Sequence, residues 1–135
     1  MSEFQFKQAA KRKTWIFPLI IIILLYLTIP VLLINKGTNN FEKAVNELDY
    51  DLIKAASYYN AGVVFTDFAT NFPGFSAWAK SVKEKNTVQL EHTFLDKCKE
   101  LKNLTIEEQN KFCLNWKKFF EKIKRKQPEC ELFCK

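Results

Sequence analysis

One long apolar run dominates the N-terminal part of the chain. Residues 15–35 read WIFPLIIIILLYLTIPVLLIN, and no charged side chain lies between Lys13 and Lys36. About twenty helical residues at ~1.5 Å each match the ~30 Å hydrocarbon core of a bilayer. A helix in a soluble protein usually keeps a polar face, which this run lacks. The pattern predicts a transmembrane helix at residues 15–35, preceded by a tail at residues 1–14.

The residues that flank this run predict its topology. The run is longer than the core of a cleaved signal peptide and no A-x-A site follows it, which favours a retained signal anchor. Pro18 fits the first helical turn, whereas Pro30 is expected to bend the helix or end it early. More basic residues precede the span than follow it, which predicts a cytoplasmic or matrix-side N-terminus and an extracytoplasmic C-terminal domain. The basic residues are Lys7, Lys11, Arg12 and Lys13 before the span, and Lys36 and Lys43 after it.

Past the span, the hydrophobic pattern changes to a helical period. Residues 37–40 (GTNN) are polar and predict a short break, with Asn39 or Asn40 capping a helix that begins at Phe41. Apolar residues then recur at steps of three and four, which predicts one amphipathic helix to about Asp67. The members of this stripe are Val45, Leu48, Leu52, Ala56, Tyr59 and Val63.

Residues 55–79 carry a single charge, Asp67, among many alanines and aromatic residues. The Pro73-Gly74 pair predicts a turn. Three interpretations stay open: a core helix followed by an aromatic loop, a partner-binding surface, and a membrane-active segment. The candidate interface residues are Phe65, Phe68, Phe72, Phe75 and Trp78. Asp67 and several polar residues argue against full insertion of this segment into a membrane.

The C-terminal part predicts two more helices. Residues 80–86 are expected to form a charged connector, and Asn86 or Thr87 to open a helix carrying Leu90, Phe94, Cys98 and Leu101. Residues 102–104 then form a joint, and Thr105 with Glu108 fits a capping box that starts the last helix. So short a joint predicts two antiparallel neighbours. One face of the last helix carries Ile106, Phe112, Cys113, Trp116, Phe119, Phe120 and Ile123.

Composition supports a helical fold. Only three glycines and four prolines occur in 135 residues, which is few for a many-stranded β fold. About 100 residues follow the span, enough for one small domain with a single core. We therefore expect an all-α protein, with one transmembrane helix and a disulfide-stapled helical domain at residues 36–135. Trp116, Phe119 and Phe120 are expected to form the core with Phe94 and Leu101.

Four cysteines, an even number, lie beyond the span at Cys98, Cys113, Cys130 and Cys134. In a small exported domain such a set is typical of structural disulfides. Pairing Cys98 with Cys113 across the helical hairpin leaves Cys130 and Cys134 to form a local ring. The alternative ties the tail back onto the hairpin, for example through Cys113 and Cys134, and closes longer loops.

Other chemistry is sparse in the sequence. The net charge of +6 is divided between the membrane-proximal tail and the last helix, without a nucleic-acid-binding motif, so no nucleic-acid partner is expected. His92 stands alone, and no metal, cofactor or small-molecule substrate is expected. Asn103-Leu104-Thr105 is an N-glycosylation sequon in the predicted joint.

These observations favour a non-enzymatic accessory or scaffolding subunit of a membrane protein complex, in contact with lipid and with other membrane protein subunits. One alternative is a viral or lytic membrane-remodelling or fusion-associated protein that uses residues 55–79. A second is a thiol–disulfide enzyme that uses Cys130 and Cys134.

Overall fold

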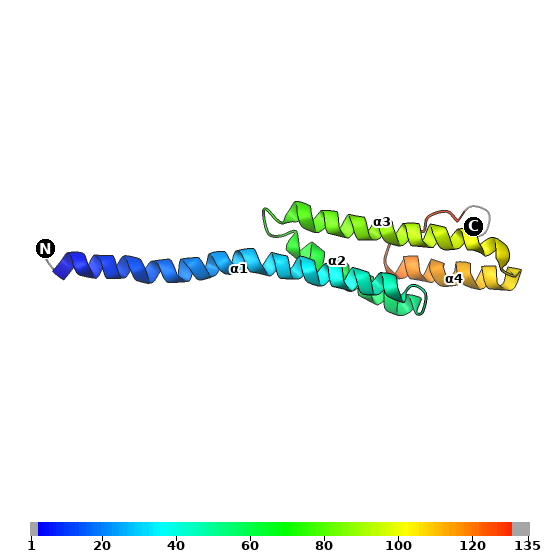
Figure 1. Ribbon diagram of the computed structural model, residues 1–135, viewed down its shortest axis with the longest axis horizontal. Helices are drawn as coiled ribbons and strands as arrows, with labels where there is room; N and C mark the ends of the chain where they lie inside the picture. The colour runs from blue at the N-terminus through cyan, green and yellow to red at the C-terminus, as the bar shows by residue number, and fades with distance from the viewer. Residues whose placement is uncertain (1–2, 131–135) are drawn as a thin grey trace.

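The computed structural model describes residues 3–130, with side chains from Thr14 onward, and its regular elements are all helices. In chain order these are α1 (Glu3–Glu47), α2 (Leu52–Ala69), α3 (Ser76–Glu100), the short 3-10 helix η1 (Leu101–Asn103) and α4 (Ile106–Lys122). The prediction of an all-α fold is confirmed for the described chain. Figure 1 shows α1 projecting out of a bundle that its own C-terminal end forms with the other helices.

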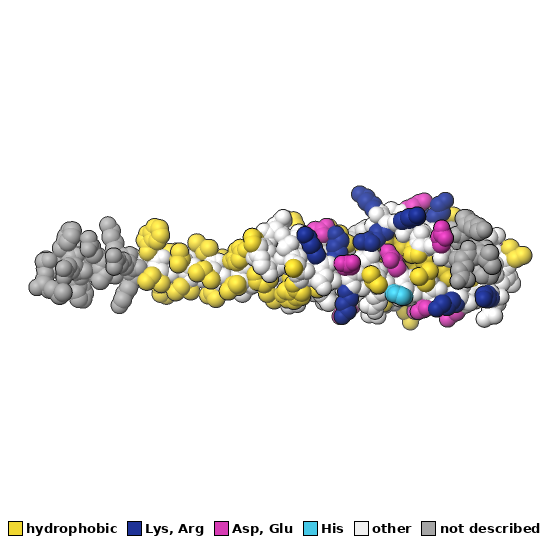
Figure 2. Space-filling model, turned by 90° about the horizontal axis from the view of Figure 1, so that it is seen from above, with side chains coloured by type: hydrophobic (Ala, Val, Ile, Leu, Met, Phe, Trp, Pro, Cys, Tyr) yellow, Lys and Arg dark blue, Asp and Glu magenta, His cyan; other side chains and the backbone are white. Residues whose placement is uncertain are grey.

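The projecting part of α1 has the properties of a membrane span. Among the described residues, one helical stretch, Thr14–Glu47 of α1, contains a segment that is long and apolar enough to cross a bilayer. The side chains of residues 14–29 are all exposed in the protein itself. Figure 2 shows hydrophobic side chains covering this stretch, whereas cationic and anionic side chains are scattered over the bundle. The basic side chains of residues 1–13 lie outside the described side chains.

The predicted break at residues 37–40 is wrong, because α1 continues through it to Glu47. Pro30 does not end the helix either, and it is buried against the bundle. The polar side chains of this stretch are accommodated within the helix: Thr38 Oγ1 donates to the Ile34 carbonyl (2.9 Å) and Asn40 Nδ2 to the Lys36 carbonyl (2.8 Å). The boundary between span and domain at residues 35 and 36 stays a prediction, since no structural break marks it.

A close helix contact explains the glycine at the centre of this stretch. A Cβ added to Gly37 would lie 2.8 Å from Thr66 Cγ2 on α2, well inside normal packing distance. A Cβ at Gly62 of α2 would likewise meet the Phe41 ring at 2.8 Å. The two glycines let α1 and α2 approach closely, and Gly37 therefore serves helix packing and not a loop.

The single helix predicted from Phe41 to about Asp67 is in fact two. The chain turns at residues 48–51, and the Asp51 carboxylate caps α2 by accepting from the backbone N–H groups of Ile53 and Lys54. Such a cap satisfies N–H groups that have no partner within the helix. The apolar stripe carried no sign of this turn because Leu48 and Leu52, on either side of it, both face the core. As a result, α2 runs back along α1.

The turn predicted at Pro73 and Gly74 is confirmed between α2 and α3, with Gly74 at φ +89°. The charged connector predicted at residues 80–86 is wrong, because α3 runs without interruption from Ser76 to Glu100. Lys80, Glu84 and Lys85 are exposed. The charges therefore belong to the solvated side of a helix.

The final hairpin follows the sequence prediction closely. The joint is η1 with Leu104, and Thr105 and Glu108 form the predicted capping box reciprocally (3.3 and 3.0 Å). The predicted core residues are all buried, and Phe94 lies 5.0 Å from the Trp116 ring and 5.2 Å from the Phe120 ring. Ile106, expected on the same face, is instead 77% exposed because it occupies the first turn of α4, past the end of the core.

Candidate functional site

The predicted interface aromatics gather where α2 meets α3, at the end of the bundle that lies against the span. We call residues 68–79 the aromatic tip; it comprises the end of α2, the turn and the start of α3. Phe68 is 62% exposed and Trp78 is 44% exposed. Phe72 and Phe75 are half-buried. The tip carries no charged residue, since Asp67 precedes it and Lys80 follows it.

Two contacts hold the aromatic tip against α1. The Tyr26 hydroxyl donates a hydrogen bond to the Pro73 carbonyl (2.9 Å), and the Tyr26 ring lies 5.7 Å from that of Phe72. Nearby, Ile34 of α1 forms a small buried cluster with Ala69 and Ala79, against which Phe75 packs. Sequence reasoning missed the role of Tyr26, although one aromatic hydroxyl in the middle of an apolar span was a signal for a partner.

Phe65, the remaining predicted interface residue, lies outside the tip. Its ring faces the Lys36 ammonium at 5.3 Å, a distance typical of a cation–π contact. Two residues further along α2, Asp67 pairs with Lys83 of α3 at 2.8 Å. Charged residues of three helices therefore lie close to one another, next to the aromatic tip.

A second surface feature, which we call the distal hollow, was not predicted. It has a volume of about 720 Å³ and lies between the turn at residues 48–53 and α4. Leu48, Trp116 and Phe119 contribute buried apolar surface, while Tyr50 (87% exposed) and Ile53 (70% exposed) stand at its edge. Tyr50 does not belong to the apolar stripe that the sequence predicts.

Charged residues surround the distal hollow. Asp49 pairs with Lys97 of α3, which links the turn to the distal half of that helix. Lys118 and Lys122 line the α4 side. Close to the rim, a hydrogen bond from Lys54 to Glu47 (3.1 Å) raises the pKa of the lysine. The rim thus combines an ion pair and further lysines with an apolar floor.

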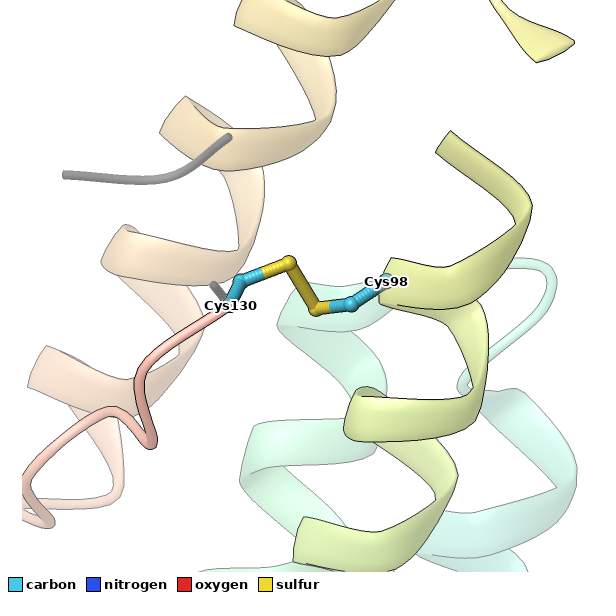
Figure 3. The surroundings of a disulfide bond; sticks show 2 residues. All are labelled: Cys98 and Cys130. Carbon is cyan, nitrogen blue, oxygen red and sulfur yellow. A yellow bond between two sulfur atoms is a disulfide. The ribbon is translucent and has the colours of Figure 1, made fainter. Parts of the chain in front are cut away.

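The cysteine pairing predicted across the hairpin is wrong. Cys98 of α3 is bonded to Cys130, and their Cα atoms lie 5.7 Å apart (Figure 3). Cys98 lies three residues before the joint and Cys113 nine residues after it, so the antiparallel hairpin does not align them. Cys113 is also disulfide-bonded.

This pairing corresponds to the tail-tethered alternative, because the segment after α4 folds back onto α3. A local ring between Cys130 and Cys134 is excluded, since Cys130 is already bonded to Cys98. Cys134 lies outside the described residues. Cys130 is therefore bonded to Cys98 and not to Cys134, the partner that a thiol–disulfide site was expected to use.

The sequon residue Asn103 lies in η1, at the end of α3 farthest from the aromatic tip, and is exposed. No known protein family, curated protein or solved structure matches this chain. Its function must therefore be inferred from its own surfaces.

Proposed function

We propose that this protein is a non-enzymatic, single-span accessory subunit of a membrane protein complex. Its helical domain would bind a protein partner at the distal hollow. The observation that supports this proposal is the hollow itself, because exposed Tyr50 and Ile53 stand beside an apolar floor. Large aromatic and aliphatic side chains around a hollow are the residues that commonly anchor protein–protein interfaces.

The chemistry of the hollow suggests what the partner presents. Asp49 is already paired with Lys97, whereas Lys118 and Lys122 face the hollow without an ion pair among the described residues. A segment with an apolar anchor and acidic flanking residues would complement this surface. Opposite charges at the rim mainly accelerate association and select the partner, while the apolar anchor supplies most of the affinity.

The proposal places the domain outside the cytoplasm, or in the equivalent compartment of an organelle, with the N-terminus inside. The excess of basic residues before the span supports this orientation. The bond between Cys98 and Cys130 is also expected of an oxidising compartment. In intact cells, a membrane-impermeant thiol reagent applied after mild reduction should label these cysteines. Labelling that requires permeabilisation would reverse the orientation.

Native electrophoresis after extraction in a mild detergent tests the partner site. The wild-type full-length protein should migrate as a complex larger than itself. Tyr50→Glu and Ile53→Glu should each shift it to the free form, because a carboxylate would oppose the apolar anchor and the acidic flank. Ile106→Glu is the matched control, since Ile106 is equally exposed (77%) but lies outside the hollow. Unchanged migration of both hollow variants would reject the site.

Membrane remodelling through residues 55–79 is a second candidate function. The position of the aromatic tip beside Tyr26, and not at the far end of the bundle, favours it. Full-length protein reconstituted into phosphatidylcholine liposomes should then release an entrapped dye. Liposomes that stay sealed at every protein-to-lipid ratio would count against this function and leave the accessory role unaffected.

A further inference from the structure

The aromatic tip contacts α1 within the part of the helix that carries no charge. Tyr26, which contacts both Phe72 and Pro73, lies ten residues before Lys36, the first charged residue after the span. At ~1.5 Å per residue, this contact lies about 15 Å below that lysine. A bilayer that surrounds the charge-free part of α1 therefore reaches the height of the tip as well.

The charges of the other two helices agree with this height. Phe65 of α2 is level with Lys36, and Asp67 follows two residues later. On α3, Lys80 is the first charge after the turn, next to Ala79 in the cluster around Ile34. Between Asp67 and Lys80 the chain descends, turns and returns without any charged side chain. All three helices thus reach the same boundary between charged and charge-free surface.

The surface of the tip is unusual for an aqueous environment. Phe68 and Trp78 are exposed, and the neighbouring surface of α1 consists of exposed isoleucine and leucine side chains. Contiguous apolar surface of this kind marks a membrane or protein interface. Because the tip surface continues directly into that of the span, acyl chains are the occupant that the structure favours.

Backbone groups in lipid need partners within the protein. In the turn, the N–H groups of Asn71, Phe72 and Phe75 donate to the carbonyls of Phe68, Ala69 and Phe72 (3.0–3.2 Å). Pro73 has no N–H, and its carbonyl accepts from Tyr26. The Tyr26 hydroxyl would otherwise lack a partner in the hydrocarbon region, where an unpaired hydroxyl is energetically costly.

We infer that the aromatic tip is immersed in the acyl-chain region of the leaflet on the domain side, beside α1. The protein would then contact the bilayer through two elements: a helix that crosses it and a helical hairpin that enters one leaflet. Asp67 and the lysines of α3 limit the depth of the hairpin, since their charges stay at the headgroups. This inference requires only that α1 spans the membrane and does not depend on the distal hollow.

Tryptophan quenching by brominated phosphatidylcholine tests the inference on the full-length protein in vesicles. Trp15→Phe removes the fluorophore of the span and leaves Trp78 and Trp116. Bromine on the acyl chains should quench the Trp78 contribution, while aqueous iodide should not. Trp15→Phe with Trp78→Phe leaves only the core residue Trp116, whose emission should be insensitive to bromine.

A charge substitution gives a second, independent readout. Phe68→Glu should move the tip out of the lipid and reduce the quenching of Trp78 by bromine. Leu114→Glu, at a similarly exposed position of α4 (54%), should leave the quenching unchanged. Quenching of Trp78 by iodide would show that the tip is in water. A Trp78 that neither bromine nor iodide quenches would show that protein covers the tip; either result would overturn the inference.

Discussion

The buried hydrogen bond between α2 and α3 permits a quantitative test of the fold. The hydroxyl oxygens of Tyr59 and Thr87 lie 2.6 Å apart, and both residues are nearly inaccessible to solvent. The Thr87 hydroxyl already donates its proton to the Lys83 carbonyl at 2.8 Å. The Tyr59 hydroxyl must therefore be the donor, and Thr87 accepts.

This assignment predicts unequal effects of the two single substitutions. Thr87→Val keeps the shape but leaves the Tyr59 hydroxyl buried without an acceptor, which should cost about 1–3 kcal/mol. Tyr59→Phe removes the donor and leaves Thr87 bonded to Lys83, so it should cost about 0.5–1.5 kcal/mol. The double variant should be less destabilised than the sum of the two by more than about 0.5 kcal/mol, because it leaves no orphaned donor.

Denaturant unfolding of the full-length protein in detergent micelles, followed by near-UV circular dichroism, measures these free energies. The urea dependence should be the same for all four proteins, so that midpoints compare directly. Single-substitution effects that add to within about 0.3 kcal/mol would show that the two hydroxyls do not interact. A costlier Tyr59→Phe than Thr87→Val would reverse the assignment of donor and acceptor.

Three further outcomes are expected. Phe94→Ala should destabilise the domain by about 3–5 kcal/mol in the same unfolding assay, because this fully buried ring contacts three other rings. Non-reducing peptide mapping should recover a linked peptide that contains Cys98 and Cys130. Cys98→Ser should lower the free energy of unfolding by about 4 kcal/mol, because the disulfide no longer closes a loop with a sequence separation of 32 residues. When the chain is translated in the presence of microsomes, it should gain an endoglycosidase-sensitive mass that Asn103→Gln abolishes. A sequon introduced into residues 1–13 should stay unmodified. The reverse pattern would show that the topology is inverted.

The parts of the fold that local rules determine were predictable. Trp116 and Phe119 were placed in the core by their three- and four-residue spacing, and the capping box at Thr105 fixed the start of α4. Both signals act within one or two helical turns, so the sequence alone contains them. The long apolar helix was equally predictable, because twenty-two consecutive residues from Thr14 to Asn35 carry no charge.

The parts that depend on long-range packing were not predictable. Gly37 indicated a break, yet it serves the contact with Thr66, which lies 29 residues further along the chain. The partner of Cys98 depends on where the segment after α4 returns, which helical periodicity does not describe. The position of the aromatic tip beside Tyr26 likewise requires knowing that α2 runs antiparallel to α1.

α1 runs without a break from the proposed membrane span into the helical bundle, so both parts of the helix tilt together. About 18 Å of the helix, from Lys36 to Glu47, extends past the charge boundary at ~1.5 Å per residue. Transmembrane helices tilt by about 20° on average, and over that length such a tilt displaces the end of α1 sideways by about 6 Å. Because α1 continues into the bundle without a loop, the tilt is not absorbed by a hinge. Under the proposed topology, a change in the tilt of α1, to which hydrophobic mismatch with the bilayer contributes, would therefore move the distal hollow relative to the membrane.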